Sequence, residues 1–495
     1  MRMKTLPMFV GGEWVQAAEG GSREIRNPAN NEVIAVVSEG SAADAEKAIA
    51  FARRAFDEGP WPKMRAQERA SHLLKLADLI DKNAEELATT ETRNNGKPLR
   101  EARFDVADAA NCFRYYAGLI TKSLGQTFEV PDPNVQTMVV RESIGVCGQI
   151  IPWNYPLLMA AWKLAPGLAA GNCCILKPAE ATPLTAIELF DLIAEAGLPP
   201  GSAQLLPGSG EVVGQALAGS RQVDKVAFTG GTVTGRKILH AAEGNLKKVT
   251  LELGGKSPCI VFGDADFDVA LEYAMFAIYA GQGEVCSAGS RLVLDRKIAD
   301  KFLPRLAEAS SKIVVGDGLA PDTEMGPLIT RQHMERVLNY IEVGKSEGAE
   351  VLCGGKRLTE GGLAKGNFVA PTIFAQTRPD MRIVREEIFG PVLSVQLFDT
   401  EEEAVRLAND TEYGLAGGVF TTDGAKGLRV LRQLRAGITW MNCYHPTFNE
   451  APWGGYKQSG WGRELGTWGL DEYLETKQIN INLAPGKLGW FRSAN

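Results

Sequence analysis

The spacing of apolar residues changes along the chain. Between residues 8 and 40, short strand-like runs alternate with turn signals such as Asn27-Pro28. Apolar side chains then recur every three or four residues, which predicts helices over 41–59, 65–94 and 100–123. Ser41, followed three residues later by Asp44, is expected to cap the first of these helices.

From residue 145 the apolar runs become shorter and alternate between strand-like and helix-like spacing. Strands are predicted at 145–151, 173–176, 203–206, 225–229 and 248–253. Helices are predicted between them, at 156–170, 183–196, 211–218 and 234–243. This alternation is typical of a parallel sheet that helices cover on both faces.

A second alternation follows the first. Helices are predicted at 298–315, 330–347 and 401–409, with strands within 383–398 and at 437–442. Two further strand-like runs, 137–141 and 474–483, stand outside both alternations. The chain is therefore predicted to be of the α/β class, with two α/β domains.

Length and composition narrow the class of protein. A chain of 495 residues is too long for one ordinary core, so two or three domains are expected. Hydrophobic residues at 45% and charged residues at 23% are ordinary for a soluble globular protein. The net charge of -7 argues against a nucleic-acid partner, which needs a basic face. No apolar run reaches the ~18 residues of a membrane helix, and residues 1–10 lack the apolar core of a secretory signal.

One of the eight cysteines is a candidate nucleophile. The cysteines are scattered with no metal-binding spacing, which predicts reduced thiols in a cytoplasmic protein and no metal site. Cys286 lies on the glycine-containing loop 281–291, between a predicted helix and a predicted strand, where small neighbours leave its sulfur accessible. A cysteine that merely fills space gives the same local pattern. The four histidines are distant in sequence, so a Cys-His hydrolase dyad would require the fold to bring one close.

Glu252 is a candidate general base. It lies within an apolar strand that ends in a double-glycine turn. Burial would raise the pKa of its carboxyl group toward the range of a useful base. The alternative is a glutamate on an edge strand that faces water.

Five separated motifs occur in the order found in one family: PWNYP at 152–156, KPAE at 177–180, VTLELGGK at 249–256, GQGEVCSAGSR at 281–291 and EEIFGP at 386–391. Together they resemble the NAD(P)-dependent aldehyde dehydrogenase superfamily, from about residue 8 to about residue 481. The resemblance implies an aldehyde dehydrogenase-like fold. Its parts would be a Rossmann-type NAD-binding domain (1–122 and 144–254), a catalytic domain (255–471) and a small β oligomerisation arm (123–143 and 472–495). A homodimer or homotetramer is expected.

The same resemblance assigns a mechanism to three residues. The Cys286 thiolate would attack an aldehyde to form a thiohemiacetal, and hydride transfer to NAD would leave a thioester. The Asn154 side chain and the Cys286 backbone N–H would stabilise the oxyanion, one such donor being worth roughly 3 kcal/mol. Glu252 would activate the water that releases the carboxylic acid.

The cofactor is expected where a strand leads into a helix at 228–235, because free N–H groups and the helix dipole favour a pyrophosphate. Another glycine-rich stretch, 208–214, lacks the Rossmann spacing and is interpreted as a turn. A carboxylate at Glu180 would repel a 2′-phosphate, which predicts NAD over NADP. By resemblance, the cofactor-binding residues are Ile150, Pro152, Trp153, Lys177, Glu180, Gly230, Gly231, Gly235, Glu387 and Phe389. Gly231 stands where relatives often have serine.

Within the superfamily the likeness is strongest to betaine-aldehyde and aminoaldehyde dehydrogenases. Tyr155, Trp162 and Trp453 match positions of an aromatic cage, which attracts ammonium groups by about 0.5–2 kcal/mol through cation–π contacts. Asp105 and Asp108 match acidic positions near the pocket mouth. Aromatic core residues and a solvated helix face would give the same patterns.

Two departures affect this substrate prediction. Glu284 stands where many relatives have glutamine, and Ala280 where many have an aromatic residue. The extra negative charge favours a cation, whereas the small Ala280 side chain loosens the cage and admits bulkier aldehydes. The alternatives that the sequence leaves open are a broad aliphatic or aromatic aldehyde dehydrogenase, a CoA-acylating relative, a non-catalytic lens-type or scaffold protein, and a cysteine hydrolase.

Overall fold

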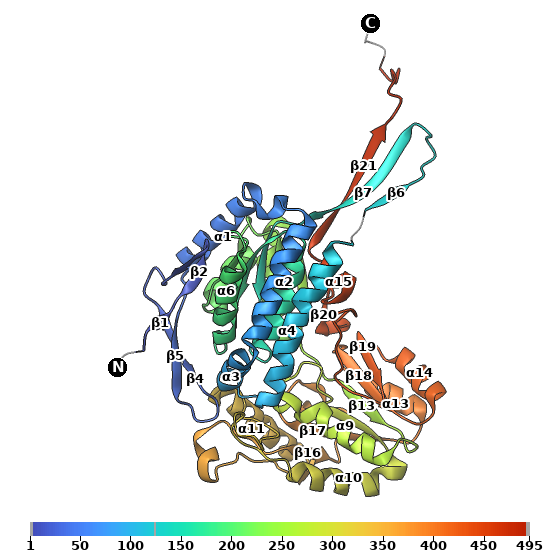
Figure 1. Cartoon of the computed structure of the whole chain (residues 1–495). Coiled ribbons are helices and arrows are strands. Elements are labelled where there is room, and N and C mark those ends of the chain that lie inside the picture. The colour runs from blue at the N-terminus through green and yellow to red at the C-terminus, as the bar shows by residue number, and fades with distance from the viewer. Residues whose placement is uncertain (1–2, 123–124, 492–495) are drawn as a thin grey trace.

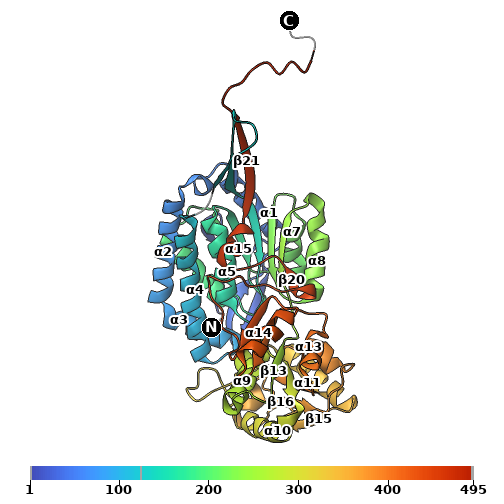
Figure 2. The same ribbon diagram turned by 90° about the vertical axis from the view of Figure 1, so that its right-hand side faces the viewer.

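The structure is a computed structural model that describes residues 3–122 and 125–491. The chain forms two lobes, each built around its own sheet, and an arm that projects from the first lobe (Figure 1). Seen from the side, the arm extends directly away from the second lobe (Figure 2). Among these residues, no helix is long and apolar enough to cross a membrane.

The sheet of the first lobe confirms the predicted strand–helix alternation. Its strand order is β20 (Gly460–Trp461), β12 (Lys248–Glu252), β11 (Lys225–Thr229), β8 (Val146–Ile150), β9 (Cys173–Lys177), β10 (Ala203–Leu205), β2 (Met8–Val10) and β3 (Glu13–Val15). The strands from β12 to β10 are parallel, whereas β20, β2 and β3 are antiparallel to their neighbours. The sheet is therefore parallel at its centre and mixed at both edges.

Helices cover both faces of this sheet, as predicted. One face carries α1 (Ala42–Asp57), α7 (Gln215–Gly219) and α8 (Thr232–Ala242). The other carries α5 (Pro156–Ala169) and α6 (Leu184–Ala196), backed by α2 (Ala66–Lys82), α3 (Ala84–Asn95) and α4 (Leu99–Ile120). A small sheet, in the order β1 (Thr5–Leu6), β5 (Val33–Ser38) and β4 (Ser22–Arg26), lies beside them.

The continuous helical pattern predicted over 65–94 is wrong in one respect, because it forms two helices. Asn83 ends α2 with φ −106° and ψ 17°, and its side-chain Nδ2 donates to the Leu79 carbonyl at 2.8 Å. An asparagine side chain that bonds to a carbonyl of the preceding turn competes with the backbone hydrogen bonds of the helix, which explains the break.

The second lobe is also α/β. Its strand order is β15 (Glu350–Cys353), β16 (Thr372–Ala375), β17 (Val392–Phe398), β14 (Arg291–Asp295), β13 (Pro258–Val261), β18 (Ala416–Phe420) and β19 (Ile438–Met441). Its helices are α9 (Phe267–Tyr279), α10 (Arg296–Ser311), α11 (Arg331–Ser346), α12 (Arg382–Arg385), α13 (Glu401–Asn409) and α14 (Gly424–Gln433). The short α15 (Gly466–Asp471) returns to pack on α5.

The arm joins two segments that are far apart in the sequence. Its strand order is β21 (Leu474–Asn482), β7 (Val135–Ser143) and β6 (Gln126–Phe128), and all pairs are antiparallel. Both strand-like runs that stood outside the α/β alternations therefore belong to one sheet. In Figure 1 this sheet extends beyond the first lobe, with its base against that lobe.

Candidate active site

A cavity of about 1230 Å³ lies where the two lobes meet. Parallel strands bring their carboxyl ends to one edge of a sheet, so Thr229 of β11 and Glu252 of β12, paired in register, enter the cavity together. The second lobe contributes Cys286 and Phe389. The carboxylate and the thiol, far apart in sequence, thus face the same space.

Cys286 is presented by a tight turn rather than by a regular element. After α9 the chain makes a short helical turn, Ala280–Gly283, in which Gly281 and Gln282 adopt φ values of 55° and 57°. The Cys286 side chain is partly exposed to the cavity. A Cβ atom at Gly255 would lie 2.3 Å from the Cys286 carbonyl oxygen, so the double-glycine turn after β12 is what allows the two segments to approach.

The environment of Cys286 keeps its thiol protonated. Burial, with the Glu252 and Glu387 carboxylates, raises the pKa of the thiol to about 12, although the backbone N–H groups of Ser287 and Cys286 lower it. The thiolate therefore requires a base or an added positive charge near the sulfur.

Glu252 is buried, which excludes the water-facing alternative. Burial raises the pKa of its carboxyl group well above the usual value, the neighbouring Glu464 raises it further, and Lys163 lowers it. Its Oε2 atom has no hydrogen-bond partner among the described residues. Lys163 forms a close ion pair with Glu464 and donates to Thr229 Oγ1 at 2.6 Å. An unpartnered buried carboxyl oxygen in a cavity is suited to receive a proton from water.

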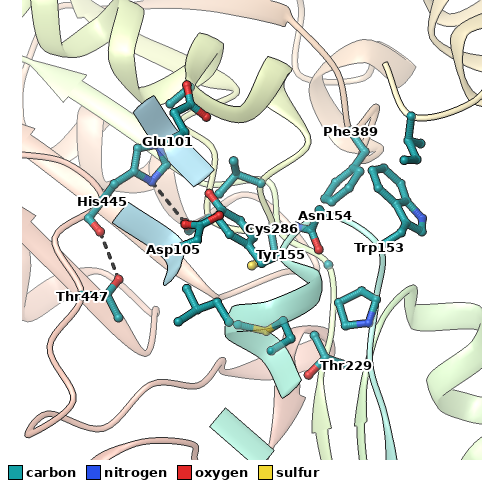
Figure 3. A pocket seen from close by; sticks show the side chains of 18 of the residues that line it. Glu101, Asp105, Trp153, Asn154, Tyr155, Thr229, Cys286, Phe389, His445 and Thr447 are labelled. Atoms are coloured by element: carbon teal, nitrogen blue, oxygen red, sulfur yellow. Dashed lines mark hydrogen bonds between the residues drawn. The ribbon is translucent and has the colours of Figure 1, made fainter. Parts of the chain in front are cut away.

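Asn154 lies on the loop after β8, within the cavity wall. Its Nδ2 donates to the Glu284 carbonyl oxygen at 2.8 Å, which fixes the amide beside Cys286. The amide group has two N–H donors. The second has no partner among the described residues, so it can serve an oxygen in the cavity. In Figure 3, Asn154 and Cys286 lie between Trp153 and Phe389 on one side and Glu101 and Asp105 on the other.

The cofactor-binding candidates divide into two groups. Pro152, Trp153, Gly230, Gly231, Glu387 and Phe389 line the cavity. Ile150, Lys177, Glu180 and Gly235 lie outside its walls, although Ile150 pairs with Lys177 at the same sheet edge. Lys177 Nζ is 3.6 Å from Glu180 Oε1, and that oxygen also accepts the Gly210 N–H at 2.6 Å.

The residues at this end fit a dinucleotide. Gly231 is the N-cap of α8, and a Cβ atom there would meet nothing within 4 Å, so the space beside the first turn of this helix is open. Trp153 and Phe389 rings pack edge to face at 5.2 Å. Glu387 accepts the Gly255 N–H at 2.8 Å, and burial raises the pKa of Glu387 to about 7.

The aromatic candidates also converge on the cavity. Trp162 and Trp453 are buried and pack edge to face at 5.7 Å. The ammonium group of Lys97 already lies over the Tyr155 ring, with its Nζ atom 4.1 Å from the ring centroid. Asp105 is buried and forms a close ion pair with Lys97, whereas Asp108 is exposed. Asp105 is therefore partly neutralised within the protein rather than free at the pocket mouth.

Sequence reasoning did not select several cavity residues. Glu464 lines the cavity, and its ion-pair partner Lys163 lies 301 positions away; the only local signal was a lysine inside an otherwise apolar helix. Glu101 and His445 also line the cavity. His445 Nδ1 is 3.3 Å from Ser287 Oγ and Nε2 is 3.1 Å from the Ala277 carbonyl oxygen, so both ring nitrogens are already engaged.

Burial lowers the pKa of His445 to about 4, which keeps the ring neutral. The described residues include no hydrogen bond between His445 and Cys286, which gives a cysteine hydrolase dyad no support. No group of three or more potential metal ligands occurs in the part of the chain that the structure describes.

The chain is similar to known proteins over nearly its whole length. The aldehyde dehydrogenase family model matches residues 14–479. The chain is 52% identical to a betaine aldehyde dehydrogenase of Bacillus subtilis over 486 residues, 98% of this chain and 99% of that protein. It is 46% identical over 481 residues to an aldehyde dehydrogenase of Aspergillus niger, covering 97% and 95% of the two chains. A crystal structure of betaine aldehyde dehydrogenase from Staphylococcus aureus in complex with NAD+ matches with a TM-score of 0.98 and 47% identity, covering 99% of this chain and 97% of that one.

Proposed function

Because the chain belongs to the aldehyde dehydrogenase family, we propose that it oxidises an aldehyde to a carboxylic acid with NAD. The observation that carries the proposal is the meeting of Cys286 and Glu252 in one cavity that also presents the N-terminus of α8. NAD, when bound, supplies the hydride acceptor. Residues at the strand ends, including Lys177 and Glu180, would hold its adenosine ribose.

In the first half of the reaction, Cys286 adds to the aldehyde carbon. The thiol proton leaves to water in the cavity; because burial and the nearby carboxylates raise the pKa of the thiol, bound NAD would supply the positive charge that favours the thiolate. The second N–H of Asn154 and the backbone N–H of Cys286 stabilise the oxyanion of the thiohemiacetal. Loss of hydride from that carbon leaves a thioester on the sulfur.

In the second half, Glu252 takes a proton from water, and the resulting hydroxide attacks the thioester carbon. The carbon–sulfur bond breaks and the carboxylic acid is released. Glu464 and Lys163 set the charge around Glu252, since the first raises its pKa and the second lowers it. A hydrolytic base so placed argues against a CoA-acylating enzyme and a non-catalytic scaffold.

The proposed substrate is betaine aldehyde or an ω-aminoaldehyde. The relatives from B. subtilis and S. aureus carry the name betaine aldehyde dehydrogenase. Tyr155, Trp162 and Trp453 supply aromatic surface for an ammonium group, and Asp105 and Asp108 line the same cavity. A broad-specificity enzyme for aliphatic or aromatic aldehydes is the second candidate, favoured by the space beside Ala280.

The arm and the cysteines support a homo-oligomer in the cytoplasm. The three-stranded arm leaves the full length of β21 at its outer edge, which supports association with further copies as a homodimer or homotetramer. The eight cysteines are all free thiols, which supports a cytoplasmic location.

The test compares the wild-type enzyme with Cys286→Ser. With NAD and betaine aldehyde, the wild type should form NADH, and it should do so more slowly with NADP because Glu180 repels the extra phosphate. Cys286→Ser should fall to about a thousandth of that rate or less, since serine ionises far less readily. Cys443→Ser, which changes another partly exposed thiol outside the cavity, should keep full activity. A fully active Cys286→Ser enzyme would refute the proposal.

A further inference from the structure

At the substrate end of the cavity, the lining has fewer aromatic rings and more charged side chains than a purely aromatic cage would have. Lys97 is buried and already occupies one face of the Tyr155 ring. A substrate cation would therefore share that ring with an internal cation, which weakens the attraction. Ala280 contributes no ring beside it. A cationic substrate needs another source of negative potential here.

Three other acids near this point are unsuited to that role. Asp105 already forms a close ion pair with Lys97. Glu91 lies 3.9 Å from the same ammonium group, and its other oxygen accepts the Thr185 hydroxyl at 2.7 Å. Asp108 is exposed on the next turn of α4, where water screens its charge.

Glu101 differs from these acids in its contacts. Its side chain is half-buried, lines the cavity, and accepts one hydrogen bond, from the Gly281 N–H to Oε2 at 3.0 Å. The closest ion pairs of Lys97 are with Asp105 and Glu91 rather than with Glu101. A Cβ atom at Gly281 would lie 3.9 Å from Glu101 Oε2 and 3.8 Å from the Tyr155 hydroxyl, so carboxylate and phenol converge next to Ala280. Figure 3 shows Glu101, Asp105 and Tyr155 on the same side of Cys286.

We propose that Glu101 is the residue that selects cationic aldehydes. Its carboxylate attracts the ammonium group of the substrate in the space that the small Ala280 side chain leaves open. A quaternary ammonium group has no N–H, so this attraction is a charge contact across van der Waals distance rather than a hydrogen bond. The assignment rests on the proposed function and deepens it, because it names the group that recognises the substrate cation.

Recognition of the substrate cation by Glu101 should depend on pH. Burial raises the pKa of Glu101 to about 7; Lys97 and, more weakly, Arg100 lower it, and Asp105 raises it. The pKa of the facing Tyr155 is far above this range, so the phenol stays neutral. Below about pH 7, Glu101 takes up a proton and the attraction is lost. The KM for a cationic aldehyde should therefore rise as pH falls, while the KM for a neutral aldehyde of the same shape should not.

The experiment measures kcat/KM for betaine aldehyde and for its carbon isostere, in which a tert-butyl group replaces the trimethylammonium group. Glu101→Gln should lower kcat/KM for betaine aldehyde about 10- to 100-fold, mainly through KM. It should leave the isostere within about twofold, because glutamine keeps the shape and can still accept the Gly281 N–H. Glu101→Asp should restore part of the preference. Glu86→Gln, an exposed charge on α3 outside the cavity, is the matched control and should change neither substrate.

Activity with the isostere reports directly on folding and chemistry in each variant. A preference for betaine aldehyde that survives Glu101→Gln, or that is lost in Asp108→Asn instead, overturns the assignment alone. A wild-type enzyme that oxidises both aldehydes equally well overturns the cationic substrate class together with the assignment. A pH-dependent KM that persists in Glu101→Gln also contradicts it.

Discussion

Glu252 is the residue whose substitution should separate the two halves of the reaction. Replacing it by Gln removes the base that activates water but leaves the Cys286 sulfur in place. The steady-state rate should fall about 100- to 10,000-fold, the range that general base catalysis contributes. A thioester on Cys286 should accumulate, and intact-protein mass spectrometry after mixing with NAD and aldehyde would detect it.

The pH profile gives a second readout of the same residue. Burial and Glu464 raise the pKa of Glu252, and only the ionised carboxylate can accept a proton. Thioester hydrolysis by the wild type should therefore increase as pH rises through that raised pKa. In Glu252→Gln this rise should disappear, so an unchanged profile or a variant with no trapped thioester would assign the base elsewhere.

At the scale of single residues, the sequence predicted those functional residues whose immediate neighbours in sequence mark them. Cys286 was marked by its glycine-rich loop, and Glu252 by its place in an apolar strand. Lys163, Glu464 and Glu101 were not predicted, because their roles depend on partners distant in sequence. Glu101, for example, reaches Gly281, 180 positions away. The sequence did place Asp105 at the cavity, but its pairing with Lys97 is a property of the folded chain.

At the scale of elements, the start of α1 shows a helix cap that is formed by residues close together in sequence. Ser41 Oγ accepts the Asp44 N–H at 3.3 Å, and Asp44 Oδ2 accepts the Ser41 N–H at 2.9 Å, the reciprocal bonds of a capping box. Ser41→Ala should destabilise the first turn of α1 by about 1 kcal/mol. Amide hydrogen exchange there should accelerate about fivefold, with little change in enzymatic rate.

The companion variant Ser41→Thr keeps the hydroxyl and should restore most of the protection. Equal exchange in Ser41→Ala and the wild type would mean that the hydroxyl does not hold the first turn, which leaves the bond from the Ser41 N–H to Asp44 as the cap. This cap was predictable because its two residues are three positions apart. The break at Asn83 was not predicted, since apolar spacing continues through it and only the asparagine side chain signals the interruption.

At the scale of the whole molecule, the sequence predicted two α/β units because strand and helix spacing alternate clearly. It did not predict that β20, from residues 460–461, joins the sheet of the first lobe beside β12. A two-residue strand has no periodicity, and its pairing is fixed only when the chain returns from the second lobe. The meeting of the lobes creates the cavity, so the site is a property of the complete chain.

One face of the arm is predicted to contact a second copy of the chain. Ile479 and Ile481 are two residues apart on β21, so they share one face, which Met138 of β7 joins by pairing with Ile479. Ile481 is 40% exposed, and β21 has an open edge. Such a surface on a projecting sheet is suited to burial against a second copy. Ile481→Lys should therefore shift the protein toward monomer in sedimentation velocity. Gln478→Lys adds the same charge to the opposite face and should leave the assembly intact. If both variants sediment like the wild type, the copies associate through another surface.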